Sequence, residues 1–151
     1  GSTMALIDLV TEEVIRIPMI STTKNEVMRE LATLLHRAGK IEEIEPVVEA
    51  LLERERKGST GLEAGLAVPH SKTSLVDGLV LAIGIAPNGI DFEALDGELS
   101  RLFFMLLAPP DQSGPHIEAL SEIARLTQSK SFCNSLVGST SAAEVVELFT
   151  E

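Results

Sequence analysis

Apolar residues recur along this chain in two patterns, one with the spacing of a helix and one nearly continuous. The helical spacing is clearest in the segment that follows Thr23. Its apolar stripe consists of Val27, Leu31, Leu34 and Leu35. Thr23 and Glu26 have the spacing of a capping box, and Gly39 supplies a stop signal. The pattern therefore predicts a helix between Thr23 and Gly39.

Three more segments carry the signals of helices. One begins near Pro46 and ends by Gly58, and another has Pro115 in its first turn. A helix close to the C-terminal end starts at the capping box formed by Ser141 and Glu144. The stripe that we expect the Pro115 helix to bury comprises Ile117, Leu120, Ile123, Ala124 and Thr127.

The continuous apolar runs lie between these helices and are typical of strands. Residues 79–86 and 102–108 are apolar at nearly every position, which indicates strands covered on both faces at the centre of a sheet. Shorter runs at 14–17 and 66–68 are also predicted to be strands, and Pro87-Asn88-Gly89 is predicted to be a turn. Because helices and strands are interleaved, we predict a single-domain α/β sandwich.

Composition narrows the function classes. The 151 residues are 44% hydrophobic, enough for one core. The longest apolar stretch, Leu102–Ala108, is far shorter than the roughly 20 residues of a membrane-spanning helix. A net charge of −11 disfavours nucleic acids and anionic membranes as partners and favours a basic or mixed-charge protein. No signal-peptide pattern is present, so we expect a cytoplasmic protein, and Gly1-Ser2-Thr3 is typical of a cloning remnant.

The chain has three histidines, and their surroundings differ. His36 lies near the end of the first predicted helix, where an imidazole interacts favourably with the helix dipole, so we interpret it as structural. His116 falls in the first turn of a predicted helix, where free backbone N–H groups attract anions. His70 directly follows Pro69, whose missing N–H ends the strand and directs the next side chain out of the sheet edge.

His70 is the main candidate for chemistry on these grounds. A neutral imidazole is a competent nucleophile and proton carrier, and several hydrogen-bond donors lie close to this one in the sequence. The side-chain donors are Ser59, Thr60, Ser71, Lys72 and Thr73. The same position also suits a histidine that merely ends a strand beside a loop, and the residues alone leave both interpretations open.

Other kinds of site fit the sequence poorly. No Gly-Lys-Ser/Thr follows the glycines of 58–65, as a nucleotide-binding loop would require, and no Gly-x-Ser-x-Gly of the serine hydrolases occurs. The single Cys133 excludes an internal disulfide and a multi-cysteine zinc site, and we expect it to be a partly buried hydrophobe. A metal site would need His70 and His116 to converge with carboxylates from elsewhere, so we expect none.

Four motifs occur in a specific order along the chain. They are RERKGSTG (54–61), GLAVPHSK (65–72), GIDFEALDG (89–97) and LLAPPDQSGPHIEALSEIARL (106–126). Together they closely resemble the mannitol/fructose family of phosphotransferase-system enzyme IIA domains. The resemblance covers nearly the whole chain, and it assigns residues 4–151 to one IIA domain of this type.

The resemblance implies a mixed central sheet flanked by helices and a phosphorelay that needs no external cofactor. A carrier protein, HPr or its nitrogen-branch counterpart, would phosphorylate His70, and the phosphoryl group would pass to a cysteine of a IIB domain. The residues that match supporting positions are His116, which would lie beside the phosphorylated histidine, and Arg54. We add Ser59, Thr60 and Ser71 as hydrogen-bond donors to the phosphoryl oxygens.

Two positions differ from the family pattern, and three functions remain open. Glu63 and Ser71 stand where glycine is common, and a carboxylate at Glu63 would repel a phosphoryl group unless it turned to solvent. The first function is a component of fructose, mannitol or related polyol uptake. The second is a nitrogen-regulatory phosphoprotein that binds targets according to its phosphorylation, and the ends of the chain are consistent with a free-standing protein. The third is a binding module that has lost phosphotransfer.

Overall fold

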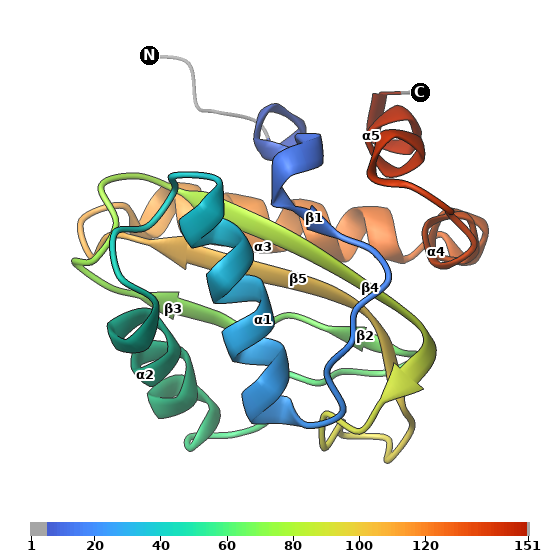
Figure 1. Ribbon diagram of the computed structural model, residues 1–151, viewed down its shortest axis with the longest axis horizontal. Coiled ribbons are helices and arrows are strands. Elements are labelled where there is room, and N and C mark those ends of the chain that lie inside the picture. Colours follow the sequence, from blue (N-terminus) through green and yellow to red (C-terminus); the bar gives the residue numbers. More distant parts are fainter. Residues whose placement is uncertain (1–5, 151) are drawn as a thin grey trace.

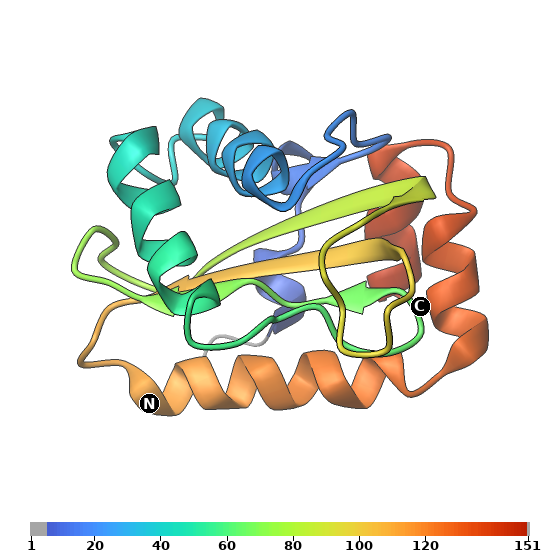
Figure 2. The ribbon, with the colours of Figure 1, turned by 90° about the horizontal axis from the view of Figure 1, so that it is seen from below.

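The computed structural model describes residues 6–150, which form a sheet covered by helices on both faces (Figures 1 and 2). The expected cloning remnant, residues 1–3, lies outside the described part. This sheet with helices on both faces confirms the α/β architecture predicted from the alternating elements. Within residues 6–150, no helix combines the length and the apolar character needed to cross a membrane.

The sheet is mixed, as the family resemblance implied. Its strands are β1 (Ile15–Arg16), β2 (Leu66–Ala67), β3 (His70–Lys72), β4 (Val80–Ile90) and β5 (Ser100–Ala108). β4 and β5 pair antiparallel in the centre, whereas β1 pairs parallel with β4, and both β2 and β3 pair parallel with β5. The two apolar runs predicted to form the centre of the sheet do so.

The helices divide between the two faces of the sheet. Two cover one face, α1 (Lys24–Arg37) and α2 (Ile44–Glu55). Three cover the other, α3 (Ser113–Thr127), α4 (Lys130–Val137) and α5 (Ala142–Thr150), as Figure 2 shows with the sheet seen edge-on. Short 3-10 helices at Leu6–Leu9 and Glu12–Val14 precede β1. Of these elements, α4 was not predicted from the sequence.

Alternate side chains of the central strands pack against opposite helical layers. Phe103 and Met105 of β5 pack against the α1–α2 layer, and Phe104 and Leu106 pack against the α3–α5 layer. All four are fully buried. Because successive side chains of a strand point to opposite faces, a strand covered on both sides must be apolar throughout. This explains why the central strands read as continuous apolar runs.

The predicted capping residues start both α1 and α5, with one common variation. Thr23 Oγ1 accepts from the N–H of Glu26, and Ser141 Oγ accepts from the N–H of Glu144, each at 3.2 Å. Neither glutamate completes the box on the cap residue itself. Each carboxylate instead accepts from the backbone N–H of the threonine before the cap, at 3.0 Å. The side chains thereby satisfy donors on both sides of each cap.

The turn predicted at Pro87-Asn88-Gly89 is wrong. Strand β4 continues through these residues to Ile90, and its pairing with β5 shifts in register between Ile85 and Ile90. Such an irregularity tolerates a proline that cannot donate to the ladder, and Gly89 there has a φ of +80°. Proline and glycine signals mark a bulge here rather than a chain reversal.

The stripe predicted to be buried on α3 is also wrong in part. Ile117 is 63% exposed and Ala124 is exposed, whereas the buried residues of the helix are His116, Ala119 and Ile123. The buried face is rotated by about one residue from the expected one. Ala124 lines the pocket described next, and Ile117 directly follows His116, so exposed apolar residues were mistaken for core.

Candidate functional site

His70 lies on the edge of the sheet, at a break between two short strands. It was predicted to follow the end of a strand, but it begins β3, opposite Leu106 of β5. Pro69 separates β2 from β3, and its carbonyl accepts from the N–H of Leu106 at 2.9 Å. Because the N–H and the carbonyl of an extended residue point to the same side, the missing N–H of Pro69 removes one donor to β5 at this point of the ladder. Pro69 thus interrupts the strand without breaking its attachment to β5.

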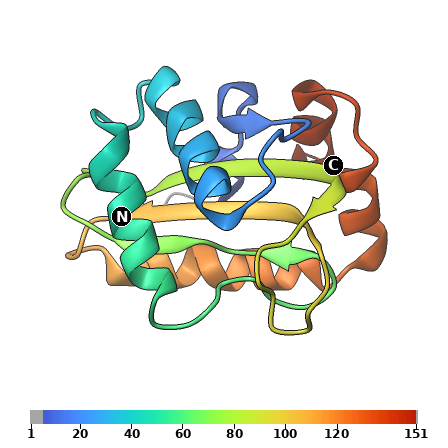
Figure 3. The same ribbon diagram turned by 60° about the horizontal axis from the view of Figure 1, so that its bottom comes forward.

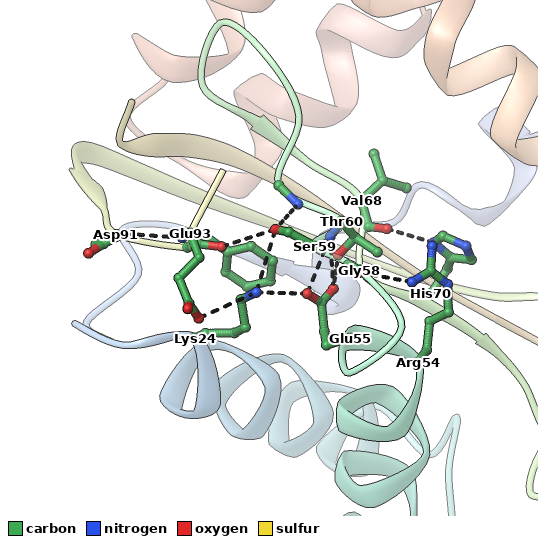
Figure 4. Close-up of polar contacts among 12 residues, drawn as sticks. Lys24, Arg54, Glu55, Gly58, Ser59, Thr60, Val68, His70, Asp91 and Glu93 are labelled. Carbon is green, nitrogen blue, oxygen red and sulfur yellow. Dashed lines mark hydrogen bonds and ion pairs between the residues drawn. The ribbon is translucent and has the colours of Figure 1, made fainter. Parts of the chain in front are cut away.

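The imidazole of His70 has a defined proton position. Its Nδ1 lies 2.8 Å from the carbonyl oxygen of Val68 (Figure 4). Because a carbonyl oxygen only accepts, Nδ1 carries the hydrogen of the neutral ring. The lone pair is then on Nε2, at the far side of a ring that is only half-buried. The hydrogen bond of Nδ1 thus leaves the Nε2 lone pair of His70 without a proton.

His116 lies beside His70, although the two residues are 46 positions apart in the sequence. Their ring centroids are 5.6 Å apart, with the planes at 58°. His116 is 5% exposed, and its pKa is lowered by burial first and then by the charges of His70 and Lys72. Its Nε2 is buried and has no hydrogen-bond partner within residues 6–150. A buried polar atom in this position is suited to bind a ligand group.

Arg54 contributes positive charge to the same site from the last turn of α2. One guanidinium nitrogen donates to the carbonyl of Gly58 at 3.0 Å. No carboxylate forms an ion pair with Arg54 among the described residues, although many other arginines of the chain have one. Its charge therefore remains available to an anion.

The three hydroxyl residues proposed as donors are placed differently. Ser59 and Thr60 line the pocket that holds His70 and Arg54. The Thr60 hydroxyl donates to Glu55, and Ser59 Oγ accepts from the N–H of Gly61 at 3.1 Å. Ser71 is buried on the face of β3 opposite to His70, because side chains alternate along a strand. The structure thus does not bring the Ser71 side chain together with the others.

Lys72 was named among the donors near His70 in the sequence, but it was not carried into the final set of predicted site residues. It lies two positions after His70 in β3, so both side chains share a face of the strand. Its Nζ is 3.2 Å from Ser113 Oγ at the start of α3, and its charge contributes to the lowered pKa of His116. The period of two in a short strand was the signal that could have identified it.

A pocket of about 350 Å³ lies beside His70. Its lining residues are Arg54, Ser59, Thr60, Leu62, Leu66, Val68, His70, Leu120, Ile123, Ala124, Thr127 and Gln128. No carboxylate is among them, and Glu63 is exposed outside this lining. Within residues 6–150, no three histidine, cysteine, aspartate or glutamate side chains gather as metal ligands. The site thus combines the half-buried imidazole of His70, the buried imidazole of His116 and positive charge.

The segment before His70 is held by the loop that joins β4 to β5, and Figure 3 shows the two lying side by side. Leu95 donates its N–H to the carbonyl of Gly61 at 3.0 Å, and Ala64 donates to the carboxylate of Asp96 at 3.1 Å. A Cβ at Gly61 would approach Ala94 Cα to 2.9 Å, so only glycine fits this contact. These contacts fix one side of the pocket.

An α/β sheet with His70 on its edge and His116 beside it outlines the class of protein, and comparison with known proteins gives the family. Residues 8–151 match the family described as "Phosphoenolpyruvate-dependent sugar phosphotransferase system, EIIA 2". This chain therefore belongs to the enzyme IIA family of the sugar phosphotransferase system. The resemblance found in the sequence motifs is confirmed.

Three known proteins illustrate the breadth of this family. The fructose-specific EIIABC component of Bacillus subtilis (strain 168) is 32% identical over 148 residues, which are 98% of this chain but 23% of that protein's length. The crystal structure of nitrogen regulatory protein IIA-Ntr from Neisseria meningitidis has a TM-score of 0.87 and 32% identity, covering 95% of this chain and 98% of that one. Enzyme IIAMTL in its complex with phosphorylated enzyme IIBMTL from Escherichia coli has a TM-score of 0.78 and 26% identity, covering 93% and 96%.

Proposed function

We propose that this protein is a phosphocarrier that receives a phosphoryl group on Nε2 of His70 and passes it to another protein. The observation that carries the proposal is the hydrogen bond from His70 Nδ1 to the Val68 carbonyl. This bond holds the proton on Nδ1, so the lone pair on Nε2 is free to attack phosphorus. The donor would be an HPr-type carrier, and the acceptor would be a cysteine of a IIB domain.

The reaction consists of two displacements at phosphorus. In the first, the Nε2 lone pair of His70 forms a bond to phosphorus as the bond to the donor breaks. In the second, the thiolate of the acceptor forms the bond to phosphorus, and Nε2 recovers its lone pair. Phosphoryl transfer of this kind depends mainly on position and charge, so no cofactor is needed.

The surroundings of His70 favour both steps. The lowered pKa of His116 favours a neutral ring near pH 7. With its hydrogen on Nε2, the buried nitrogen that has no partner within residues 6–150, this ring would donate to a phosphoryl oxygen. Arg54 and Lys72 supply positive charge, and Ser59 lies at the pocket wall as a further hydroxyl group. The hydroxyl of Thr60 already donates to Glu55, so Thr60 is not a donor to the phosphoryl group. The absence of a carboxylate from the described lining avoids repulsion of the anion.

The surface around His70 is suited to a protein donor and a protein acceptor. Leu62 is 37% exposed and Ile117 is 63% exposed, and exposed Ala124 lies in the same pocket wall as Leu62. Exposed apolar groups around a polar centre are typical of a surface that another protein covers. The complex of the related enzyme IIAMTL with phosphorylated enzyme IIBMTL supports a IIB domain as the acceptor.

The test is intact mass before and after incubation with phosphoenolpyruvate, enzyme I and HPr or its nitrogen-branch counterpart. We expect the wild type to gain one acid-labile phosphoryl group and His70→Ala to gain none, with its circular dichroism unchanged. His36→Ala is the matched control, because this exposed histidine in the last turn of α1 should leave acceptance intact. Full phosphorylation of His70→Ala, or none of the wild type with either carrier, would contradict the proposal.

A nitrogen-regulatory role is the second candidate, favoured by the TM-score of 0.87 to IIA-Ntr of Neisseria meningitidis. In that role the phosphorylated and unphosphorylated forms would differ in the regulatory proteins that they bind. Incubating the phosphorylated protein with IIB domains separates the two roles. Transfer to a IIB cysteine supports uptake of a sugar such as fructose or mannitol, whereas retention of the phosphoryl group with all IIB domains supports regulation.

A further inference from the structure

An ion pair between Lys24 and Glu55 lies behind the site, between the ends of two helices. Lys24 Nζ is 2.8 Å from the carboxylate of Glu55, and the two side chains are only 14% and 5% exposed (Figure 4). Lys24 is the first residue of α1, and Glu55 is the last residue of α2. The pair therefore connects the two helices of one layer directly under segment 58–61.

Helix stability does not explain this pair. A lysine at a helix N-terminus and a glutamate at a helix C-terminus each oppose the dipole of their own helix. Buried ion pairs are also often no more stabilising than apolar residues of the same volume. Arg29 and Glu45 already join α1 to α2 by an exposed ion pair, without burying charge. The buried pair thus calls for another reason.

Glu55 connects to the nucleophile through three consecutive links. Its carboxylate accepts from the backbone N–H of Thr60, at 3.2 Å to each oxygen, and from the Thr60 hydroxyl. The carbonyl of Thr60 accepts from the N–H of Val68 at 2.9 Å. The carbonyl of Val68 accepts from Nδ1 of His70 at 2.8 Å. Thr60 and Val68 are thereby each held through both their N–H and their carbonyl, from Glu55 to the imidazole.

Lys24 holds the carboxylate in the orientation that these links require. Its ammonium group also lies 3.5 Å from Ser59 Oγ and 4.9 Å from the ring centroid of Phe92. A partly exposed contact to Glu93 at 3.5 Å completes its surroundings. The same segment holds Arg54 through the carbonyl of Gly58. A change at the pair would therefore affect both the nucleophile and the guanidinium.

We propose that Glu55 and Lys24 are positioning residues that fix the tautomer and orientation of His70 through the backbone of Thr60 and Val68. Neither would contact the phosphoryl group. The inference rests on the proposed function, because it concerns the rate at which His70 accepts phosphate. It predicts a loss in kcat rather than in the affinity for the donor protein.

The test compares Glu55→Gln with Glu45→Gln, a glutamate of the same helix that pairs with α1 at the surface. Long-range ¹H–¹⁵N NMR of the unphosphorylated proteins reports the tautomer of His70. We expect the Nδ1–H form in wild type and Glu45→Gln, and an added Nε2–H population in Glu55→Gln. With phosphorylated HPr as the probe, kcat should fall about tenfold in Glu55→Gln, with KM changed less than about twofold. Lys24→Arg, which keeps the charge, should retain most of the wild-type rate.

The outcomes separate this inference from the proposed function. If wild type accepts phosphate and Glu55→Gln matches Glu45→Gln in tautomer and kcat, the positioning role is overturned. If wild type accepts no phosphate, the proposed function fails, and the tautomer spectra still decide the positioning role. If Glu55→Gln does not fold, Lys24→Gln replaces it, because that variant removes the positive charge of the pair and keeps the Glu55 carboxylate. Unfolding of both variants would overturn the proposal, because the pair would then serve the fold.

Discussion

Strands β4 and β5 at the centre of the sheet bury most of their side chains. In contrast, β2 and β3 at its edge are two and three residues long and are separated by Pro69. The centre is held by apolar contacts on both faces. The edge is held by hydrogen bonds that end on the His70 imidazole. On the proposed function, the centre of the sheet supplies stability and its edge supplies the chemistry. Mutations in the two parts should accordingly have separable effects.

The largest effect on stability should come from the centre. Phe104 is fully buried in β5 and meets Phe149 of α5 with ring centroids 6.3 Å apart. Phe104→Ala should lower the free energy of unfolding by about 3–5 kcal/mol, because it removes apolar contacts and leaves a cavity. Urea unfolding measures this loss. Molecules that remain folded should still accept phosphate, and a selective loss of acceptance would argue against separate roles.

Substitution of His116, which lies beside His70 at the sheet edge, should affect phosphoryl acceptance more than stability. His116→Ala should slow phosphoryl acceptance by about 100-fold, because it removes a preorganised donor to the phosphoryl oxygens. Rapid-quench kinetics with phosphorylated HPr would measure the rate. Wild-type kinetics in this variant would reduce His116 to a structural residue at the start of α3.

The lowered pKa of His116 also predicts a dependence of stability on pH. The unfolded chain takes up a proton near the ordinary histidine pKa of 6.5, while folded His116 resists it because of burial and nearby positive charge. Stability should therefore fall as the pH drops below about 6.5 and continue to fall to the lowered folded pKa. Urea unfolding across this window measures the slope, and His116→Ala should reduce it. An equal slope in the variant would mean that other groups cause it.

The smallest effect should come from the exposed apolar residues around His70, such as Ile117. Ile117→Ser should raise the KM for phosphorylated HPr by a few-fold and leave kcat unchanged, because the side chain would contact the partner and not the phosphoryl group. Its free energy of unfolding should change by less than about 0.5 kcal/mol, since the residue is exposed. Steady-state kinetics separates the two constants. A fall in kcat with constant KM would place Ile117 in the reaction itself.

The sequence allowed much of the centre to be predicted and less of the edge. Continuous apolar runs identified β4 and β5, because only strands covered on both faces are apolar at every position. The exposed Ile117 could not be told from core, since apolar residues look alike whether a helix layer or a partner protein covers them. Pro87 was misassigned because the same residue types mark turns and bulges.

The residues of the candidate site were likewise predictable from the sequence only in part. Ordered motifs pointed to His70, His116 and Arg54. His70 and Arg54 line one pocket, and the ring of His116 lies beside that of His70. The contact between Lys24 and Glu55 joins residues 31 positions apart, and nothing in the spacing of charges along the chain indicates it. Such links depend on how two helix ends meet in space. They become visible only once the fold is known.

The most direct test of the account is to determine which ring nitrogen becomes phosphorylated. The protein is incubated with phosphoenolpyruvate, enzyme I and HPr, and long-range ¹H–¹⁵N and ³¹P NMR spectra are recorded for wild type and His70→Ala. The account predicts a single phosphohistidine in the wild type, with phosphorus on Nε2 of His70 and hydrogen retained on Nδ1. Phosphorus on Nδ1, on His116, or on neither histidine would contradict it.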